Sequence, residues 1–321
     1  MNHYIMISGN GRSGSNRLLD ILDRSAFTAC RNEMNGVQGG DFWEPVIGAK
    51  LFREDLTPAR QEKLEYAVSR ARARRSDADR PPKVAKPHFR PQWLSDAVHW
   101  ATSKDKLRAI MGRTPLLETE QEWNLSSLYT DHAKLAEALL VMKLNGGPSW
   151  TMHLHDTDPN AHIIHNIRDP RAYLNSWYNR FAMQTDLSEF EQHFPDVPRI
   201  LAHFGHNDAD RLRDLSKESL MEIELWRWRY TNETLHQGLA DSERAITVTY
   251  ADVDADPRAA AEKVYAFAGL EFNDEVAELV QTMRNTLFAK KHAVKLENSL
   301  IDDLVDKVLD GSPLKAIPNL F

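Results

Sequence analysis

The sequence of 321 residues contains a single cysteine, Cys30. One cysteine cannot form an internal disulfide, and this usage is typical of proteins in a reducing compartment. No run of 18 or more apolar residues occurs, so the sequence predicts no membrane-spanning helix. The first residues also lack the basic stretch followed by an apolar stretch that marks a secretory signal. We therefore expect a cytoplasmic protein without a membrane partner.

The chain has no strong excess of one charge. It carries 40 Lys and Arg against 47 Asp and Glu, for a net charge of -7. This balance gives no reason to expect non-specific binding to nucleic acid. Internal repeats, low-complexity tracts and flexible linkers are also missing, so the simplest organisation is a single domain over residues 1–321.

Short apolar runs predict the strands of a parallel sheet. The order of strand, glycine turn, helix and strand in residues 3–31 is that of a βαβ unit. We predict an α/β protein with a three-layer, P-loop-like fold, in which helices flank a mostly parallel sheet of about five strands. The predicted strands are residues 3–8, 27–31, 138–144, 162–167 and 245–250. The predicted helices are residues 15–23, 57–75, 93–108, 169–181, 211–237 and 256–269.

A glycine-rich turn, SGNGRSGSN, follows the first predicted strand at residues 8–16. Glycines allow left-handed backbone conformations, in which successive N–H groups converge on one point. The helix that begins near Ser15 adds the positive end of its dipole, and the Arg12 guanidinium can contact two anion oxygens at once. The turn therefore predicts an anion-binding loop. Its expected binding residues are Gly11, Arg12, Ser13, Gly14, Ser15 and Asn16.

Two common nucleotide-binding patterns fit this loop poorly. A nucleotide-triphosphatase loop requires a lysine after its last glycine, whereas Ser15 follows Gly14 here. The glycine spacing of a dinucleotide-binding loop is present, but no acidic residue ends the second strand in the matching context. Glu33 is the nearest candidate.

Residues 12–15, RSGS, resemble the 5′-phosphosulfate-binding loop of sulfotransferases that use 3′-phosphoadenosine 5′-phosphosulfate (PAPS). The resemblance is to the arginine form of this loop in carbohydrate and several bacterial sulfotransferases. Asn16 replaces the usual small hydroxyl residue and can still donate a hydrogen bond. The resemblance implies that this loop binds the phosphosulfate of PAPS.

A second segment, IHNIRDPRAYLNS at residues 164–176, resembles the 3′-phosphate motif of the same family. The resemblance implies that Arg168 and Ser176 hold the 3′-phosphate. Arg168 follows a predicted strand, and the carboxyl end of such a strand is where open α/β sheets bind ligands. Residues 248–270 resemble the C-terminal strand and helix of the family, and we interpret them as carrying fold rather than chemistry.

The resemblance also implies a catalytic set of Glu33, Lys143 and Arg12. Glu33 lies 21 residues beyond Arg12, at the position of a glutamate in carbohydrate sulfotransferases, and would be the general base. The family's Glu-Pro is Glu33-Met34 here. Lys143 resembles the lysine after the third strand of the family, which stabilises the sulfuryl oxygens or the leaving phosphate.

Other residues near these motifs bear on the choice of base. Asn145 stands where cytosolic sulfotransferases carry a catalytic histidine, and an amide cannot accept the proton, which favours Glu33. His88, in a Lys-Pro-His sequence, and Glu44, before a proline, are alternative bases.

We therefore predict a sulfotransferase that moves a sulfuryl group from PAPS to a hydroxyl of a sugar, small alcohol or similar acceptor, and releases PAP. By analogy with phosphoryl transfer, the displacement is in line. No metal is required, because backbone amides, Arg12 and a lysine can meet the charge. A mainly helical insertion at residues 36–135 would shape the acceptor site. A P-loop kinase or triphosphatase and a non-catalytic nucleotide-binding protein are the alternatives.

Overall fold

The computed structural model describes residues 3–32, 47–73, 83–89, 131–180, 194–214, 216–286 and 298–321. Its centre is a five-stranded sheet in the order β2-β3-β1-β4-β5, and every neighbouring pair is parallel. The five predicted strands are confirmed, each within one residue at either end. They are β1 (Tyr4–Gly9), β2 (Thr28–Arg31), β3 (Leu139–Asn145), β4 (Ala161–Ile167) and β5 (Ala245–Thr249).

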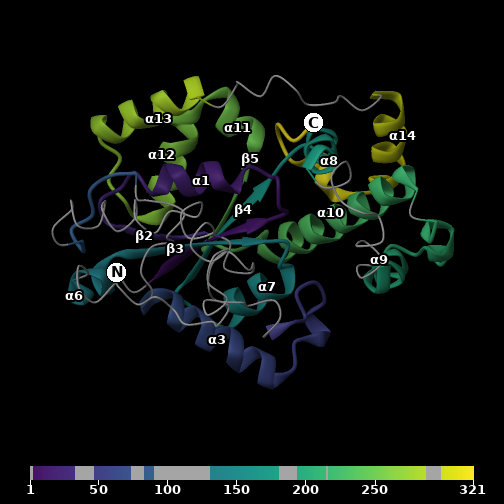
Figure 1. Cartoon of the computed structure of the whole chain (residues 1–321), viewed down its shortest axis with the longest axis horizontal. Helices are drawn as coiled ribbons and strands as arrows, with labels where there is room; N and C mark the ends of the chain where they lie inside the picture. The colour runs from purple at the N-terminus through teal and green to yellow at the C-terminus, as the bar shows by residue number, and fades with distance from the viewer. Residues whose placement is uncertain are drawn as a thin grey trace, which may run out of the picture.

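Helices cover both faces of this sheet, which confirms the predicted three-layer α/β fold (Figure 1). The α-helices are α1 (Ser15–Leu22), α3 (Pro58–Ala73), α6 (His132–Glu137), α7 (Pro148–Thr157), α8 (Pro170–Arg180), α9 (Val197–His203), α10 (Lys217–Leu239), α11 (Tyr250–Ala255), α12 (Pro257–Ala268), α13 (Asp274–Thr286) and α14 (Asn298–Val308). Three short 3₁₀ turns are η2 (Arg53–Asp55), η6 (Ala209–Leu212) and η7 (Pro313–Ala316). Among the helices of the described ranges, none is long and apolar enough to cross a membrane.

The central strand β1 is mostly apolar on both sides, because successive side chains point to opposite faces and both faces are covered. In β1, Ile5 and Ile7 pack with α1 and α12 on one face, while Tyr4 and Met6 pack with α3, α7 and the end of α10 on the other. All four side chains are buried. This double burial explains why the strands appear in the sequence as continuous apolar runs rather than alternating ones.

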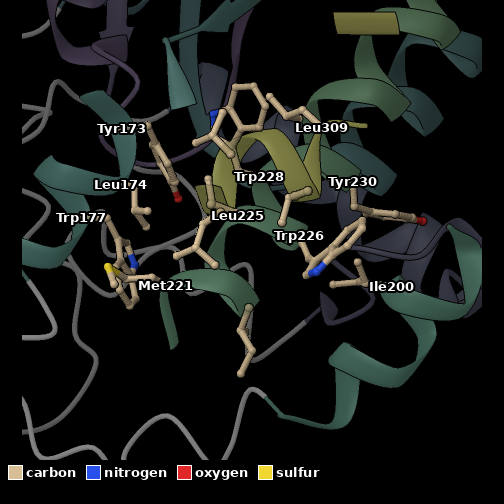
Figure 2. Packing of buried hydrophobic residues seen from close by; sticks show 14 of the residues in the cluster. Tyr173, Leu174, Trp177, Ile200, Met221, Leu225, Trp226, Trp228, Tyr230 and Leu309 are labelled. Atoms are coloured by element: carbon tan, nitrogen blue, oxygen red, sulfur yellow. The ribbon is translucent and has the colours of Figure 1, made fainter. Parts of the chain in front are cut away.

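A third cluster of buried side chains lies between α8, α9, α10 and α14 (Figure 2). It contains Trp226 and Trp228 of α10, both nearly inaccessible to solvent. In Figure 2, Tyr173 of α8 lies beside Trp228, and their ring centroids are 6.4 Å apart. The cluster therefore fixes α8 against α10, which matters because α8 carries predicted binding residues.

The predicted bounds of the long helix at residues 211–237 are wrong at both ends. The helix α10 begins at Lys217 because the Ser216 side chain accepts a hydrogen bond from Ser219 N, a cap that the sequence reading overlooked. It also continues through Gly238 instead of ending there. A Cβ atom on Gly238 would lie 2.5 Å from Cε of Met152, so this glycine permits close packing of α10 on α7.

The helix α7 was not predicted, although it starts at Pro148 directly behind the predicted Asn-Gly-Gly turn. Two of its histidines are tied to protein partners. His153 Nε2 lies 3.3 Å from Glu65 Oε1, and His155 Nε2 lies 2.7 Å from the Ser242 hydroxyl. The segment forms the connection between β3 and β4.

The predicted insertion at residues 36–135 is described only in part. The helix expected at residues 57–75 is present as α3, whereas the one expected at residues 93–108 lies outside the described residues.

Candidate active site

The loop after β1 takes the expected left-handed backbone conformation at Gly14, whereas Gly11 does not and Arg12 does instead. Gly14, the N-cap of α1, has φ 95°, and Arg12 has φ 69°. A Cβ atom on Gly14 would lie 2.3 Å from Cδ2 of Tyr250, and one on Gly9 would lie 2.1 Å from the carbonyl oxygen of Asn166. Gly11 would meet no atom within 4 Å, so that side of the loop is open.

The helix α1 begins at the loop without a side-chain cap. Its N-cap, Gly14, has no side chain to accept a hydrogen bond, although the Gly14 carbonyl accepts one from Arg17 N at 2.8 Å. The N–H groups at the positive end of a helix dipole bind anions. The loop itself is fixed from behind, since Asn166 Nδ2 donates to the Ser13 carbonyl at 3.1 Å and to its hydroxyl at 2.8 Å.

The two predicted halves of the site lie against each other. Arg12 Nε donates to the Ser176 hydroxyl at 3.1 Å, and Arg168 Nη1 donates to the Arg12 carbonyl at 3.0 Å. The predicted helix start is also present, because Asp169 Oδ1 accepts from Ala172 N at 2.7 Å and caps α8. The strand order explains the meeting, since β1 and β4 are neighbours and the residues after both strands lie at one edge of the sheet.

Arg168 has the surroundings of a group that requires an anion. Its guanidinium lies 4.4 Å from the centre of the Tyr250 ring, and its buried Nε has no hydrogen-bond partner among the described residues. Burial lowers the pKa of Arg168, and the positive charge of Arg12 lowers it further. Two cations and an unpaired buried donor would be stabilised by a bound phosphate or sulfate, so these residues fit the predicted ligand.

Lys143 reaches the same loop from β3. Its Nζ atom donates to Asn16 Oδ1 at 2.5 Å, and the side chain is buried. Ser15 Oγ donates to Asn145 Oδ1 at 3.3 Å. The lysine predicted to act on the transferred group is thus brought to the loop, and Asn145 lies beside it, where an amide can orient a partner but cannot take a proton.

The candidate bases are only partly described. Glu33 and Glu44 lie outside the described residues. His88 is buried, and burial together with Lys86 and Arg31 lowers its pKa to about 4. Lys86, two residues earlier, donates to the Asp23 carbonyl at the end of α1 and to the Thr28 hydroxyl at the start of β2. This is the edge of the sheet opposite the loop, so the geometry separates His88 from Arg12 and Lys143.

Sequence reasoning missed Tyr250, because the segment that contains it was interpreted as structural. The ring lies against Gly14 and beneath Arg168, and it stands directly after β5. Its position at the carboxyl end of a parallel strand was the signal that could have identified it. Within the described ranges, no group of three or more His, Cys, Asp or Glu side chains could hold a metal ion.

Several solved structures resemble this fold at low sequence identity. Sulfotransferase STF9 from Mycobacterium avium has a TM-score of 0.44 and 13% identity, with 96% of this chain and 76% of that chain covered. The sulfotransferase domain from the curacin biosynthetic pathway has a TM-score of 0.42 and 16% identity, with 96% and 90% covered. The sulfotransferase domain from the Synechococcus PCC 7002 olefin synthase has a TM-score of 0.41 and 15% identity, with 95% and 93% covered.

A comparison with curated proteins finds no match. The sequence pattern of the sulfotransferase family, however, matches residues 5–274, which include the loop, the Arg168–Ser176 segment, β2 to β5 and all of β1 except Tyr4. The match extends over most of the chain. The chain therefore belongs to the sulfotransferase family.

Proposed function

We propose that this sulfotransferase uses PAPS as its donor and transfers the sulfuryl group to an acceptor hydroxyl. The observation that carries the proposal is the hydrogen bond between Arg12 and Ser176, together with the bond from Arg168 to the Arg12 carbonyl. These contacts join the two segments that were expected to bind the two ends of one nucleotide. A single anion would need only one of the segments.

Each segment has a separate binding role in this proposal. The loop from Gly11 to Asn16 binds the 5′-phosphosulfate through its backbone N–H groups and through Arg12. Arg168 and Ser176 bind the 3′-phosphate. The Nε atom of Arg168 has no hydrogen-bond partner in the described part of the chain, and in this proposal it donates to that phosphate.

The transfer breaks the bond between sulfur and the bridging oxygen of PAPS and forms a bond between sulfur and the acceptor oxygen. Arg12 and Lys143 stabilise the negative charge that develops on the sulfuryl and bridging oxygens. Glu33 takes the proton of the acceptor hydroxyl as that oxygen attacks. PAP leaves with the electron pair of the broken bond, and no metal takes part in this scheme.

The acceptor in this proposal is a sugar, a small alcohol or a similar hydroxyl compound. The support is the arginine form of the loop, which the chain shares with carbohydrate sulfotransferases. The insertion at residues 36–135 contributes the acceptor side of the site.

Calorimetric titration of PAP into the purified protein tests the donor assignment. We expect micromolar binding that does not require magnesium. Binding of ATP with magnesium, and none of PAP, would overturn the assignment and favour a kinase or triphosphatase instead.

A further inference from the structure

Behind the phosphate loop, three buried polar side chains form a connected row. His165 of β4 has its Nε2 atom 3.0 Å from Asn232 Oδ1, and Asn232 Nδ2 donates to Asn10 Oδ1 at 2.8 Å. All three side chains are at least nine-tenths buried. Asn10 is the first residue after β1, so the row ends on the loop itself.

A second hydrogen bond, between a side chain of α8 and one of α10, lies beside the loop. Tyr173 of α8 donates its hydroxyl hydrogen to Glu224 Oε1 of α10. Burial and the Glu224 carboxylate raise the pKa of the Tyr173 hydroxyl well above its usual value, and a contact with the Asn10 side chain opposes this rise. Tyr173 and Ser176 are three residues apart on α8, so they lie on neighbouring parts of one helix face. Both therefore reach the loop, Tyr173 at Asn10 and Ser176 at Arg12.

The hydrogens of this row point one way, from His165 of β4 through Asn232 of α10 to Asn10. Asn232 Nδ2 also donates to the Trp228 carbonyl, so its Oδ1 atom is the acceptor and His165 Nε2 is the donor. Burial lowers the pKa of His165 to about 4, which leaves the imidazole neutral and able to donate from that one nitrogen. Aligned hydrogen bonds of this kind polarise and strengthen one another.

The final acceptor, Glu224, is a half-buried carboxylate. Burial raises its pKa, while the positive charges of Arg227 and Lys50 oppose that rise. Its second oxygen has no hydrogen bond to any residue that the structure describes. The row therefore ends on the one member that can carry a charge at neutral pH.

We propose that His165, Asn232, Tyr173 and Glu224 are positioning residues that hold Asn10, and with it the phosphate loop, in register with α8. The proposal rests on the donor function proposed above. Without the row, Asn10 would lose its side-chain partners, and Arg12 would no longer be held at the distance that lets it meet Ser176. The row would then affect donor binding although none of its members touches the donor.

Removal of one hydroxyl provides the test. Tyr173→Phe deletes the link between Asn10 and Glu224, and Tyr265→Phe is a matched control. Tyr265 is also buried, and its hydroxyl donates a single bond to the Ile21 carbonyl at 3.0 Å, on the far end of α1. We expect both variants to lose similar amounts of thermal stability. Only Tyr173→Phe should weaken PAP binding, by about tenfold.

A second pair of variants separates positioning from catalysis. Glu224→Gln keeps an oxygen that can accept from Tyr173, whereas Glu224→Ala does not. We expect the glutamine variant to retain PAP affinity and kcat within about threefold, and the alanine variant to raise the KM for PAPS by about tenfold. A collapse of kcat in the glutamine variant with unchanged PAP affinity would make Glu224 a catalytic residue and overturn the proposal.

The two proposals fail in different ways. If the wild-type protein binds PAP and both tyrosine variants bind it equally well, the positioning role is wrong and the donor function stands. If the wild-type protein does not bind PAP, the donor function is wrong, and the positioning proposal falls with it.

Discussion

Arg12 and Ser176 are 164 residues apart in the sequence, and Arg12 Nε donates a hydrogen bond to the Ser176 hydroxyl at 3.1 Å. The bond joins the loop after β1 to the helix after β4. Because β1 and β4 are adjacent and parallel, both segments leave the sheet at the same edge. A donor with phosphate groups at two positions can therefore be bound by residues from distant parts of the chain.

The loop glycines should differ in their tolerance of a side chain. Gly14→Ala places a Cβ atom against Tyr250 at a φ of 95°, so we expect a loss of about 2–4 kcal/mol in the free energy of unfolding. Gly11→Ala meets no atom within 4 Å, and its effect should stay within about 0.5 kcal/mol. Denaturant unfolding of the two variants measures this difference. Equal stabilities would show that the described loop conformation is wrong.

Lys143→Met should separate donor binding from transfer. PAP lacks the sulfuryl group that Lys143 is proposed to stabilise, so PAP affinity should change little. The rate of sulfuryl transfer from radiolabelled PAPS should fall by about 100-fold to 1000-fold. Lys263→Met is the control, since that lysine donates to the Thr247 carbonyl at the surface. A Lys143 variant as active as this control would exclude the proposed role.

Glu33→Gln should remove the base without removing the donor site. We expect kcat to fall by about 100-fold to 10 000-fold, because the amide cannot accept the acceptor's proton. In the wild type, protonation of the base at low pH should lower kcat. The variant should no longer show this fall. Glu44→Gln, the matched variant, should leave kcat unchanged. The opposite result for the two variants would transfer the role of base to Glu44.

The sheet was predictable from sequence because strands covered on both faces are short, continuous apolar runs. The loop and the Arg168–Ser176 segment were predictable because their residue types and spacing are local. The loop and this segment lie together because β4 is beside β1 in the sheet. Neither motif by itself predicts that strand order.

Other parts could not be predicted, since they depend on packing. Gly238 resembles a helix end in sequence, yet α10 continues through it, and Met152 occupies the space that a side chain at this position would need. Tyr173 and Glu224 have no spacing that marks them as partners, because they lie on different helices. Their relationship arises only when α8 packs on α10, as Figure 2 shows for the surrounding side chains.

The stability of the protein should depend on pH through Glu222. This buried carboxylate accepts hydrogen bonds from Arg211, Lys307 and Trp226, and these partners outweigh the effect of burial and lower its pKa from 4.5 to about 2. A depressed folded-state pKa stabilises the protein above the unfolded pKa, and this contribution is lost as pH falls through the folded value. We expect about 3 kcal/mol of stabilisation at neutral pH, lost between about pH 5 and pH 2.

Unfolding of the wild type and of Glu222→Gln across that pH range measures the contribution. The variant should be less stable at pH 7 and should lose less stability on acidification. Parallel curves for the two proteins would rule out Glu222 as the source.

The most direct test of the PAPS assignment is calorimetric titration of PAP into the wild type, Arg168→Ala and the control Arg171→Ala. Arg171 is a neighbouring arginine on α8 whose nearest partner is Asp302, at 2.6 Å on the surface. The account predicts micromolar binding to the wild type and to the Arg171 variant, and at least a 30-fold loss in the Arg168 variant, about the effect of removing one charged phosphate contact. Unchanged PAP binding after Arg168→Ala, or no binding to the wild type, would contradict it.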